Sequence, residues 1–114
     1  MKTVEYKNIL FYIGQNAQDN WDILEHSLKI NENYLWFHLN SFPSPYVIMC
    51  CTLEDICSND INDIFYYAGD LCKQNSKYKN LKDIKICYTS LKKLKKTNKI
   101  GEIIITGKRN TFKI

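Results

Sequence analysis

The sequence has one arginine, two prolines, four glycines and two histidines among 114 residues. It has no stretch that reaches the ~20 apolar residues of a membrane-spanning helix, and its N-terminal residues lack the apolar block of a signal peptide. We therefore expect a soluble, cytoplasmic protein that does not enter a membrane. Because 45% of the residues are hydrophobic, the chain can bury one core, and residues 1–114 are predicted to form a single domain.

The five cysteines form an odd set in which no two make a Cys-x-x-Cys pair. The sequence therefore predicts reduced thiols, with neither a metal site nor another cofactor. Motifs of nucleophilic, phosphate-binding and metal-dependent enzymes are also missing, and only His26 and His38 offer an imidazole. We expect that the protein is not an enzyme.

Arginine is scarce although basic residues are abundant, because fifteen of the sixteen are lysines. Lysine meets a phosphate as a flexible point charge, whereas base-specific contacts favour the planar guanidinium group of arginine. A basic surface of this kind is predicted to bind a polyanion without reading its sequence.

Charge is sorted along the chain. Residues 1–72 hold ten of the twelve acidic residues, and residues 73–114 hold thirteen of the sixteen basic ones. The basic half contains strand-like sequence, since Ile84, Ile86 and Tyr88 alternate with polar residues, so its charge belongs to a folded surface. A polyanion such as nucleic acid is the first partner to consider, and plain solubility is the alternative.

The apolar pattern predicts an α+β fold, with a largely antiparallel sheet of five to six strands and one or two packed helices. Strand-like segments lie at residues 3–6, 9–13, 34–40, 46–50, 84–89, 101–106 and 111–114. A first helix is predicted from a cap at Asp19 or Asn20 to about Lys29, and a second one follows the apolar stripe at residues 61–72. The lysine-rich residues 91–97 are predicted to connect two strands.

The predicted strand at residues 34–40 has two different faces. One face is apolar and suits a core, whereas the other is polar and aromatic. The polar-aromatic face consists of Tyr34, Trp36, His38 and Asn40. Together with Tyr46 on the returning strand, Trp36 and His38 are predicted to stack on unpaired bases. In the alternative, a helix covers this face, and Trp36 and His38 are ordinary core residues with His38 hydrogen-bonded inside.

Three segments, taken in order, resemble one known domain family. The segment Phe11-Tyr-Ile-Gly-Gln-Asn-Ala-Gln-Asp-Asn20, followed by Leu24, is similar to the opening pattern IGKNAxxNxxL. Leu35-Trp-Phe-His38 is similar to a strand with the pattern W-[LF]-H, and residues 88–97 with Gly101 are similar to a YTxxxx[VL]KK stretch and the strand after it. The family is the RNA-binding NFACT-R domain. The resemblance spans roughly residues 9–113 and includes the standalone coiled-coil domain containing protein 25 group.

The resemblance implies an α+β domain that binds RNA, with tRNA or ribosomal RNA as the ligand and translation or ribosome-associated quality control as the setting. Phosphate contacts are predicted along residues 91–97 and at a second turn, where lysines release counterions. These predicted contacts are Lys92, Lys93, Lys95, Lys96, Lys108 and Arg109. The sequence departs from the family pattern where Gln15 replaces a lysine, Tyr34 an acidic residue and Tyr46 a second histidine.

Other partners stay open at this point. DNA could take the place of RNA, and the ribosome is a further candidate partner. In a third class of function the chain is a protein-interaction adaptor, whose acidic face docks a partner without any nucleic acid. The acidic face consists of Glu54, Asp55, Asp60, Asp63 and Asp70.

Overall fold

A computed structural model describes residues 1–114, and it confirms the α+β class. A six-stranded sheet has the order β1-β2-β4-β3-β5-β8, and all of its neighbouring strands are antiparallel. Its strands are β1 (Lys2–Tyr6), β2 (Ile9–Ile13), β3 (Leu35–Leu39), β4 (Val47–Met49), β5 (Lys85–Ser90) and β8 (Asn110–Lys113). The other elements are α1 (Ala17–Ile30), α2 (Ile61–Gln74), the 3-10 turns η1 (Leu53–Asp55) and η2 (Leu91–Lys93), and the hairpin strands β6 (Leu94–Lys96) and β7 (Ile103–Ile105).

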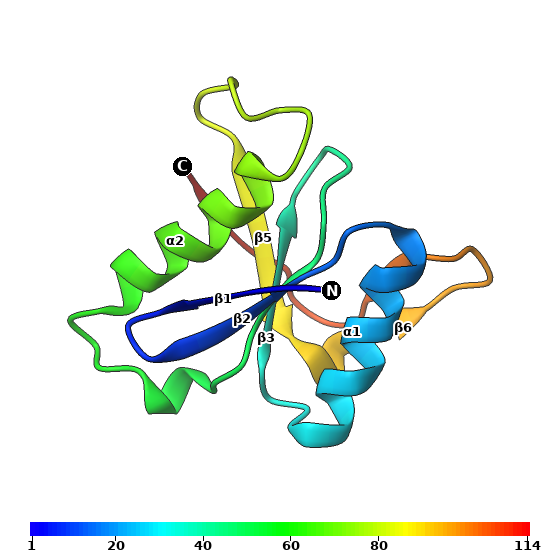
Figure 1. The fold of residues 1–114 in the computed structure, drawn as a ribbon, viewed down its shortest axis with the longest axis horizontal. Coiled ribbons are helices and arrows are strands. Elements are labelled where there is room, and N and C mark those ends of the chain that lie inside the picture. The colour runs from blue at the N-terminus through cyan, green and yellow to red at the C-terminus, as the bar shows by residue number, and fades with distance from the viewer.

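Helix α2 covers one face of the large sheet (Figure 1). Its apolar stripe packs into a cluster of fourteen buried residues, which includes the apolar face predicted for β3. Phe37 at the centre is 0% exposed, and its ring lies nearly perpendicular to that of Phe65, with centroids 5.2 Å apart. Aromatic pairs favour this edge-to-face geometry. This side of the sheet is a continuous apolar core.

Helix α1 and the β6–β7 hairpin cover the opposite face. In Figure 1 they lie on the side of the sheet away from α2. Nine buried residues form a second cluster here, in which Trp36 and Ile48 from the sheet and Tyr46 just before β4 meet Leu91 and Leu94. The large sheet is thus the middle layer of three, and each of its faces buries its own core.

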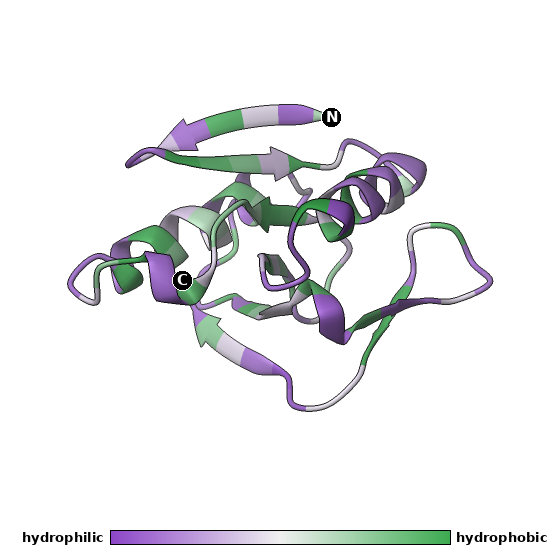
Figure 2. Cartoon of the chain, turned by 90° about the horizontal axis from the view of Figure 1, so that it is seen from below, coloured by the Kyte–Doolittle hydropathy of each residue, from purple (hydrophilic) through white to green (hydrophobic).

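The outer strand β1 differs from the inner strands in composition. Figure 2 shows it at the N-terminus as an alternation of hydrophilic and hydrophobic residues, with Lys2 and Glu5 exposed and Val4 half-buried. Charged residues on an edge strand hinder pairing with another chain. Neither α1 nor α2 has the length and apolar character that crossing a membrane requires. The five cysteines are free thiols, and two of them, Cys72 and Cys87, are buried.

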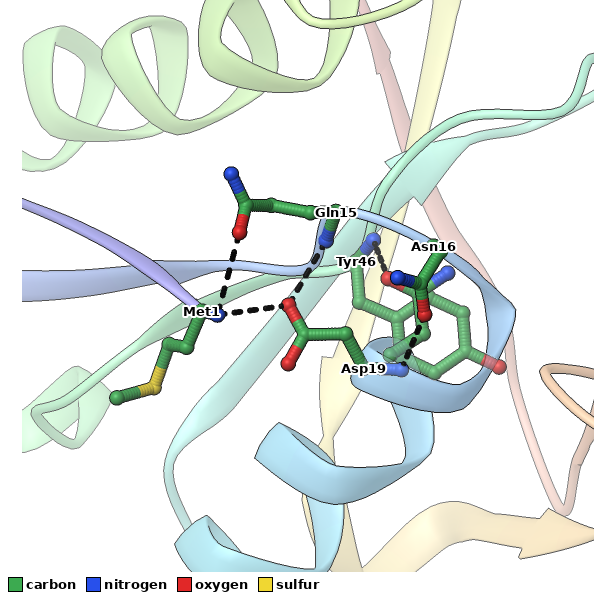
Figure 3. Close-up of polar contacts among 6 residues, drawn as sticks. Met1, Gln15, Asn16, Asp19 and Tyr46 are labelled. Atoms are coloured by element: carbon green, nitrogen blue, oxygen red, sulfur yellow. Dashed lines mark hydrogen bonds and ion pairs between the residues drawn. The ribbon is translucent and has the colours of Figure 1, made fainter.

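Helix α1 begins earlier than the sequence pattern predicts. Its cap is Asn16, whose Oδ1 accepts the backbone N–H of Asp19 at 2.8 Å. The predicted cap at Asp19 or Asn20 is wrong, because both side chains have other partners. Asp19 pairs with the amino group of Met1 at 3.1 Å, and Asn20 Oδ1 accepts the backbone N–H of Tyr46 at 3.0 Å (Figure 3).

Residues 91–97 are not a simple connector. They form η2 and then β6, which pairs with β7 in a hairpin that is separate from the large sheet. The strand predicted at residues 101–106 is present as β7, but the sequence pattern does not reveal its partner. Leu94 is the one buried residue of β6, so the sequence of this strand has no apolar alternation that would distinguish it from a loop.

Candidate nucleic-acid interface

Lys92, Lys93 and Lys95 are exposed on η2 and β6, and none of them takes part in an ion pair. The backbone beneath them is held in place, since the N–H of Lys92 donates to the carbonyl of Glu32 at 3.0 Å. Ordered backbone with unpaired ammonium groups is a suitable arrangement for contacts with phosphates, because only the side chains have to adjust.

The turn before β8 lies against these lysines. Thr106 donates its backbone N–H to the carbonyl of Lys93 at 2.7 Å and its hydroxyl to the same oxygen at 3.0 Å. At the next residue, Gly107, a β-carbon would lie 3.8 Å from Lys93 Nζ. Lys108 and Arg109 follow directly and are exposed. The structure thus brings two predicted basic segments together, and we call Lys92, Lys93, Lys95, Lys108 and Arg109 the basic track.

Lys96 differs from the other predicted phosphate contacts. Neighbouring residues of a strand point to opposite faces, and the Lys96 ammonium group forms an ion pair with Glu25 of α1. It also lies 4.9 Å from the ring centroid of Trp21, whose indole N–H donates to the carbonyl of Glu102 at 3.2 Å. Lys96 therefore helps to fasten the hairpin to α1, and its charge is already paired.

Trp36 and Tyr46 lie inside the second core, and each is only 2% exposed. The Tyr46 hydroxyl donates to the carbonyl of Gly101 at 2.6 Å, and the Trp36 ring meets that of Tyr46 nearly at a right angle, with centroids 5.5 Å apart. A base cannot stack on a ring whose faces are already covered, so the prediction that Trp36 and Tyr46 stack on unpaired bases is wrong. The alternative, in which this face is covered and Trp36 is a core residue, is correct.

His38 is half-buried, and its ring is parallel to that of Trp36 with centroids 5.4 Å apart. Its Nδ1 lies 2.7 Å from the carbonyl oxygen of Leu39. Because a carbonyl only accepts, Nδ1 carries the proton. Burial lowers the pKa of His38, and the nearby Arg109 guanidinium acts in the same direction. The imidazole is therefore mostly neutral near pH 7 and adds no charge to a phosphate site.

A groove with a volume of about 1040 Å³ opens beside the basic track, and we call it the end groove. Its walls come from the start of β1, the β2–α1 junction, β3 with the loop after it, the loop after α2, the β6–β7 hairpin and the turn before β8. Its charged lining residues are Lys2, Lys77, Lys99 and Arg109 together with one carboxylate, Glu102. Arg109 Nη1 donates to Asn40 Oδ1 at 3.2 Å, so Arg109 belongs to both the track and the groove.

The segment from Gly14 to Asn20 builds one wall of the end groove. The N–H of Gly14 donates to the carbonyl of Tyr46 at 3.0 Å, and Asn20 Oδ1 accepts the N–H of the same residue. A β-carbon on Gly14 would overlap Asn20 Oδ1, so this close approach requires glycine. The segment that resembles the opening family pattern therefore fixes the start of α1 against the residue before β4.

Much of the predicted acidic face is engaged in contacts within the chain. Lys7 Nζ pairs with Asp60 at 3.3 Å and with Asp63 at 2.6 Å. The Tyr6 hydroxyl also donates to Asp63 at 2.9 Å, and both partners lower the pKa of this carboxyl. These acids come before α2 and in its first turn, and they fasten the β1–β2 turn to that helix.

The fold is that of a small α+β domain with an exposed basic track beside a groove. The family model described as NFACT protein RNA binding domain matches residues 1–112. The chain belongs to this family, which confirms the family predicted from the three sequence segments.

A solved structure supports the fold independently. The C-terminal part of the fibronectin/fibrinogen-binding protein from Streptococcus suis is similar to the chain, with a TM-score of 0.77 and 22% sequence identity. The similarity covers 93% of this chain but 41% of that one, so the chain spans about two fifths of the length of the solved structure. No curated protein matches the chain significantly.

Proposed function

We propose that this domain binds RNA by neutralising backbone phosphates along the basic track. The observation that supports the proposal is the convergence of η2 with the turn before β8, where Lys93 Nζ lies close to Gly107. The two segments carry five basic residues, and none of them has an ion-pair partner. Each neutralised phosphate releases counterions, so the affinity is electrostatic in origin and depends on salt.

The composition of the track favours recognition of RNA shape over RNA sequence. Four of its five residues are lysines, which contact phosphates as point charges, and Arg109 already donates to Asn40. Direct reading of base edges favours several bidentate guanidinium groups, and the track has one arginine. The domain acts as a binding module without a catalytic step, and structured or single-stranded RNA is its ligand.

We further propose a cytoplasmic tRNA or ribosomal RNA as the target, in translation or ribosome-associated quality control. The family resemblance supports this setting. Crosslinking the protein in its native cell and sequencing the attached nucleic acid would test it. We expect tRNA or ribosomal RNA to be enriched, and enrichment of DNA or of messenger RNA alone would contradict the proposed target.

A pair of charge reversals tests the basic track. We expect Lys92→Glu with Lys93→Glu to weaken binding of a fluorescent tRNA on the order of 100-fold in anisotropy titrations. The matched control is Lys79→Glu with Lys82→Glu, because these exposed lysines lie in the loop before β5, whereas η2 follows the other end of that strand. The control changes net charge equally and should stay within about threefold of the unmodified protein.

Equal losses in the two variants would contradict the proposal, since they would show that net charge alone attracts the RNA. A duplex DNA of the same length serves as a second ligand. Affinity for the DNA that equals the affinity for RNA would contradict the preference for RNA and leave a general polyanion binder.

A further inference from the structure

The end groove is a feature that phosphate neutralisation along the basic track does not use. Its volume of about 1040 Å³ lies just above the range of about 300–1,000 Å³ that is typical of small-ligand sites. Contacts with phosphates need only the exposed basic side chains of the track, whereas a groove of this size has room for a small ligand.

The lining favours an anion. Lys2 comes from β1, Lys77 from the loop after α2, Lys99 from the hairpin tip and Arg109 from the turn before β8. These four cations come from separate parts of the chain and face a groove with one carboxylate. Cations from several elements that surround one cavity raise the local concentration of anions more than the same charges spread over a flat surface.

The lining also offers planar surfaces and hydrogen-bonding groups. Tyr78 is half-buried in the wall, and its ring packs on that of Phe42 with centroids 4.5 Å apart. His38 presents a largely neutral imidazole. Trp36 lines the groove as well, and its buried indole N–H has no hydrogen-bond partner. Buried donors without an acceptor are rare in proteins, and aromatic walls beside cations suit a nucleobase and its phosphate.

We propose that the end groove holds one unpaired nucleotide of the bound RNA, with its phosphate among Lys77, Lys99 and Arg109 and its base near Tyr78 and His38. This inference rests on the proposed function. It goes further, because the basic track would hold any phosphate backbone, whereas the groove selects RNA with a free end or an open loop. Arg109 belongs to both surfaces, so a strand that leaves the track can enter the groove directly.

The test compares two RNA hairpins with the same stem, one of them blunt and the other with a 3′ overhang of about three nucleotides. We expect the unmodified protein to bind the overhang RNA about tenfold more tightly, as one stacked base allows. In the variant Lys77→Glu with Lys99→Glu this ratio should fall to about one. Both lysines are exposed, so the change leaves the core intact.

Matched variants separate the groove from the track. Lys92→Glu with Lys93→Glu should weaken both RNAs by a similar factor and keep the ratio near ten. Lys79→Glu with Lys82→Glu should keep both affinities, although Lys79 lies in the same loop as Lys77. An overhang of abasic units retains the phosphates and removes the bases, and we expect it to lose most of the tenfold gain.

The groove inference would be overturned if the unmodified protein bound the overhang and blunt hairpins equally well. It would also be overturned if the Lys77→Glu, Lys99→Glu variant kept the preference for the overhang. Salt-dependent binding of the blunt hairpin would then still support the basic track, whereas a failure to bind either RNA would overturn the proposed function itself. The groove would instead belong to a protein partner if the unmodified protein bound the two hairpins equally well and also bound an acidic peptide that the Lys77→Glu, Lys99→Glu variant did not bind.

Discussion

The two faces of the six-stranded sheet are covered in different ways. On the α2 face, fourteen buried residues make one apolar core around Phe37. On the α1 face, nine buried residues form a smaller core, against which the hairpin packs Leu94, Ile103 and Ile105, and a groove opens beside it. A face that is closed by apolar packing supplies stability. A face that is closed by a small hydrogen-bonded element can also carry exposed charge and a groove.

The hairpin adds three polar contacts to this smaller apolar core. The Tyr46 hydroxyl donates to the carbonyl of Gly101, and the Trp21 indole N–H donates to that of Glu102. The Lys96 ammonium group pairs with Glu25 of α1. Burial raises the pKa of Tyr46, so its hydroxyl stays protonated and keeps donating. A typical hydrogen bond contributes about 0.5–1.5 kcal/mol, much less than a large buried side chain. The hairpin should therefore loosen without unfolding the α2 face.

The largest effect is expected on the α2 face. Phe37→Ala should lower the free energy of unfolding by about 3–5 kcal/mol, because it leaves a cavity between the sheet and α2. Urea unfolding followed by circular dichroism measures the loss. Tyr66→Ala is the control, since Tyr66 is 58% exposed on the same helix and should change stability by no more than about 0.5 kcal/mol. A loss below about 1 kcal/mol for Phe37→Ala would show that this face is not the principal core.

A smaller and more local effect is expected in the hairpin. Gly101 has φ +83°, and a β-carbon there would lie 2.7 Å from the β-carbon of Ala17. Gly101→Ala should therefore cost about 1–3 kcal/mol, and amide hydrogen exchange should accelerate at residues 94–105 but not in α2. Ile104→Ala, on the exposed side of β7, should leave exchange unchanged. Equal acceleration in α2 would contradict the independence of the two faces.

The mildest effect is a dependence on pH through His38. Burial lowers its folded-state pKa below the ordinary value of 6.5, so the unfolded state binds more protons as the pH falls through and below 6.5. Stability should therefore be complete above pH 6.5 and decrease below it. His38→Asn keeps a donor near the Leu39 carbonyl and removes the titration, so urea unfolding at several pH values should show a flatter dependence. An unchanged slope would contradict this role of His38.

Most of the fold could be predicted from the sequence, because the two-residue alternation at β3 and the helical stripe of α2 both mark residues that face one core. The short strand β6 could not be predicted in this way. Its side chains are mainly lysines, and its place depends on pairing with β7 and on contacts with α1, a helix far from it in the sequence. The sequence does not settle the cap of α1, because several neighbouring residues can cap a helix and tertiary contacts decide among them.

The basic part of the candidate site could be predicted from the sequence, because it depends on charge alone. Exposed lysines on η2 and in the turn before β8 follow from the charge pattern, but their proximity depends on the hydrogen bonds of Thr106 with Lys93. The sequence wrongly predicts that Trp36 stacks on bases, because two-residue alternation shows that Trp36 and His38 share a face of the sheet but does not show what covers that face. The end groove has no sequence signal, since its walls combine segments from β1 to the turn before β8.

The most direct test of the central claim is the salt dependence of RNA binding. If the basic track contacts about five phosphates, the logarithm of the binding constant should fall with the logarithm of salt concentration with a slope of about −3.5 to −4.5. Lys92→Gln with Lys93→Gln removes two contacts and should make the slope shallower by about 1.5. A slope near zero in the unmodified protein, or the same slope in the variant, would contradict phosphate binding by the track.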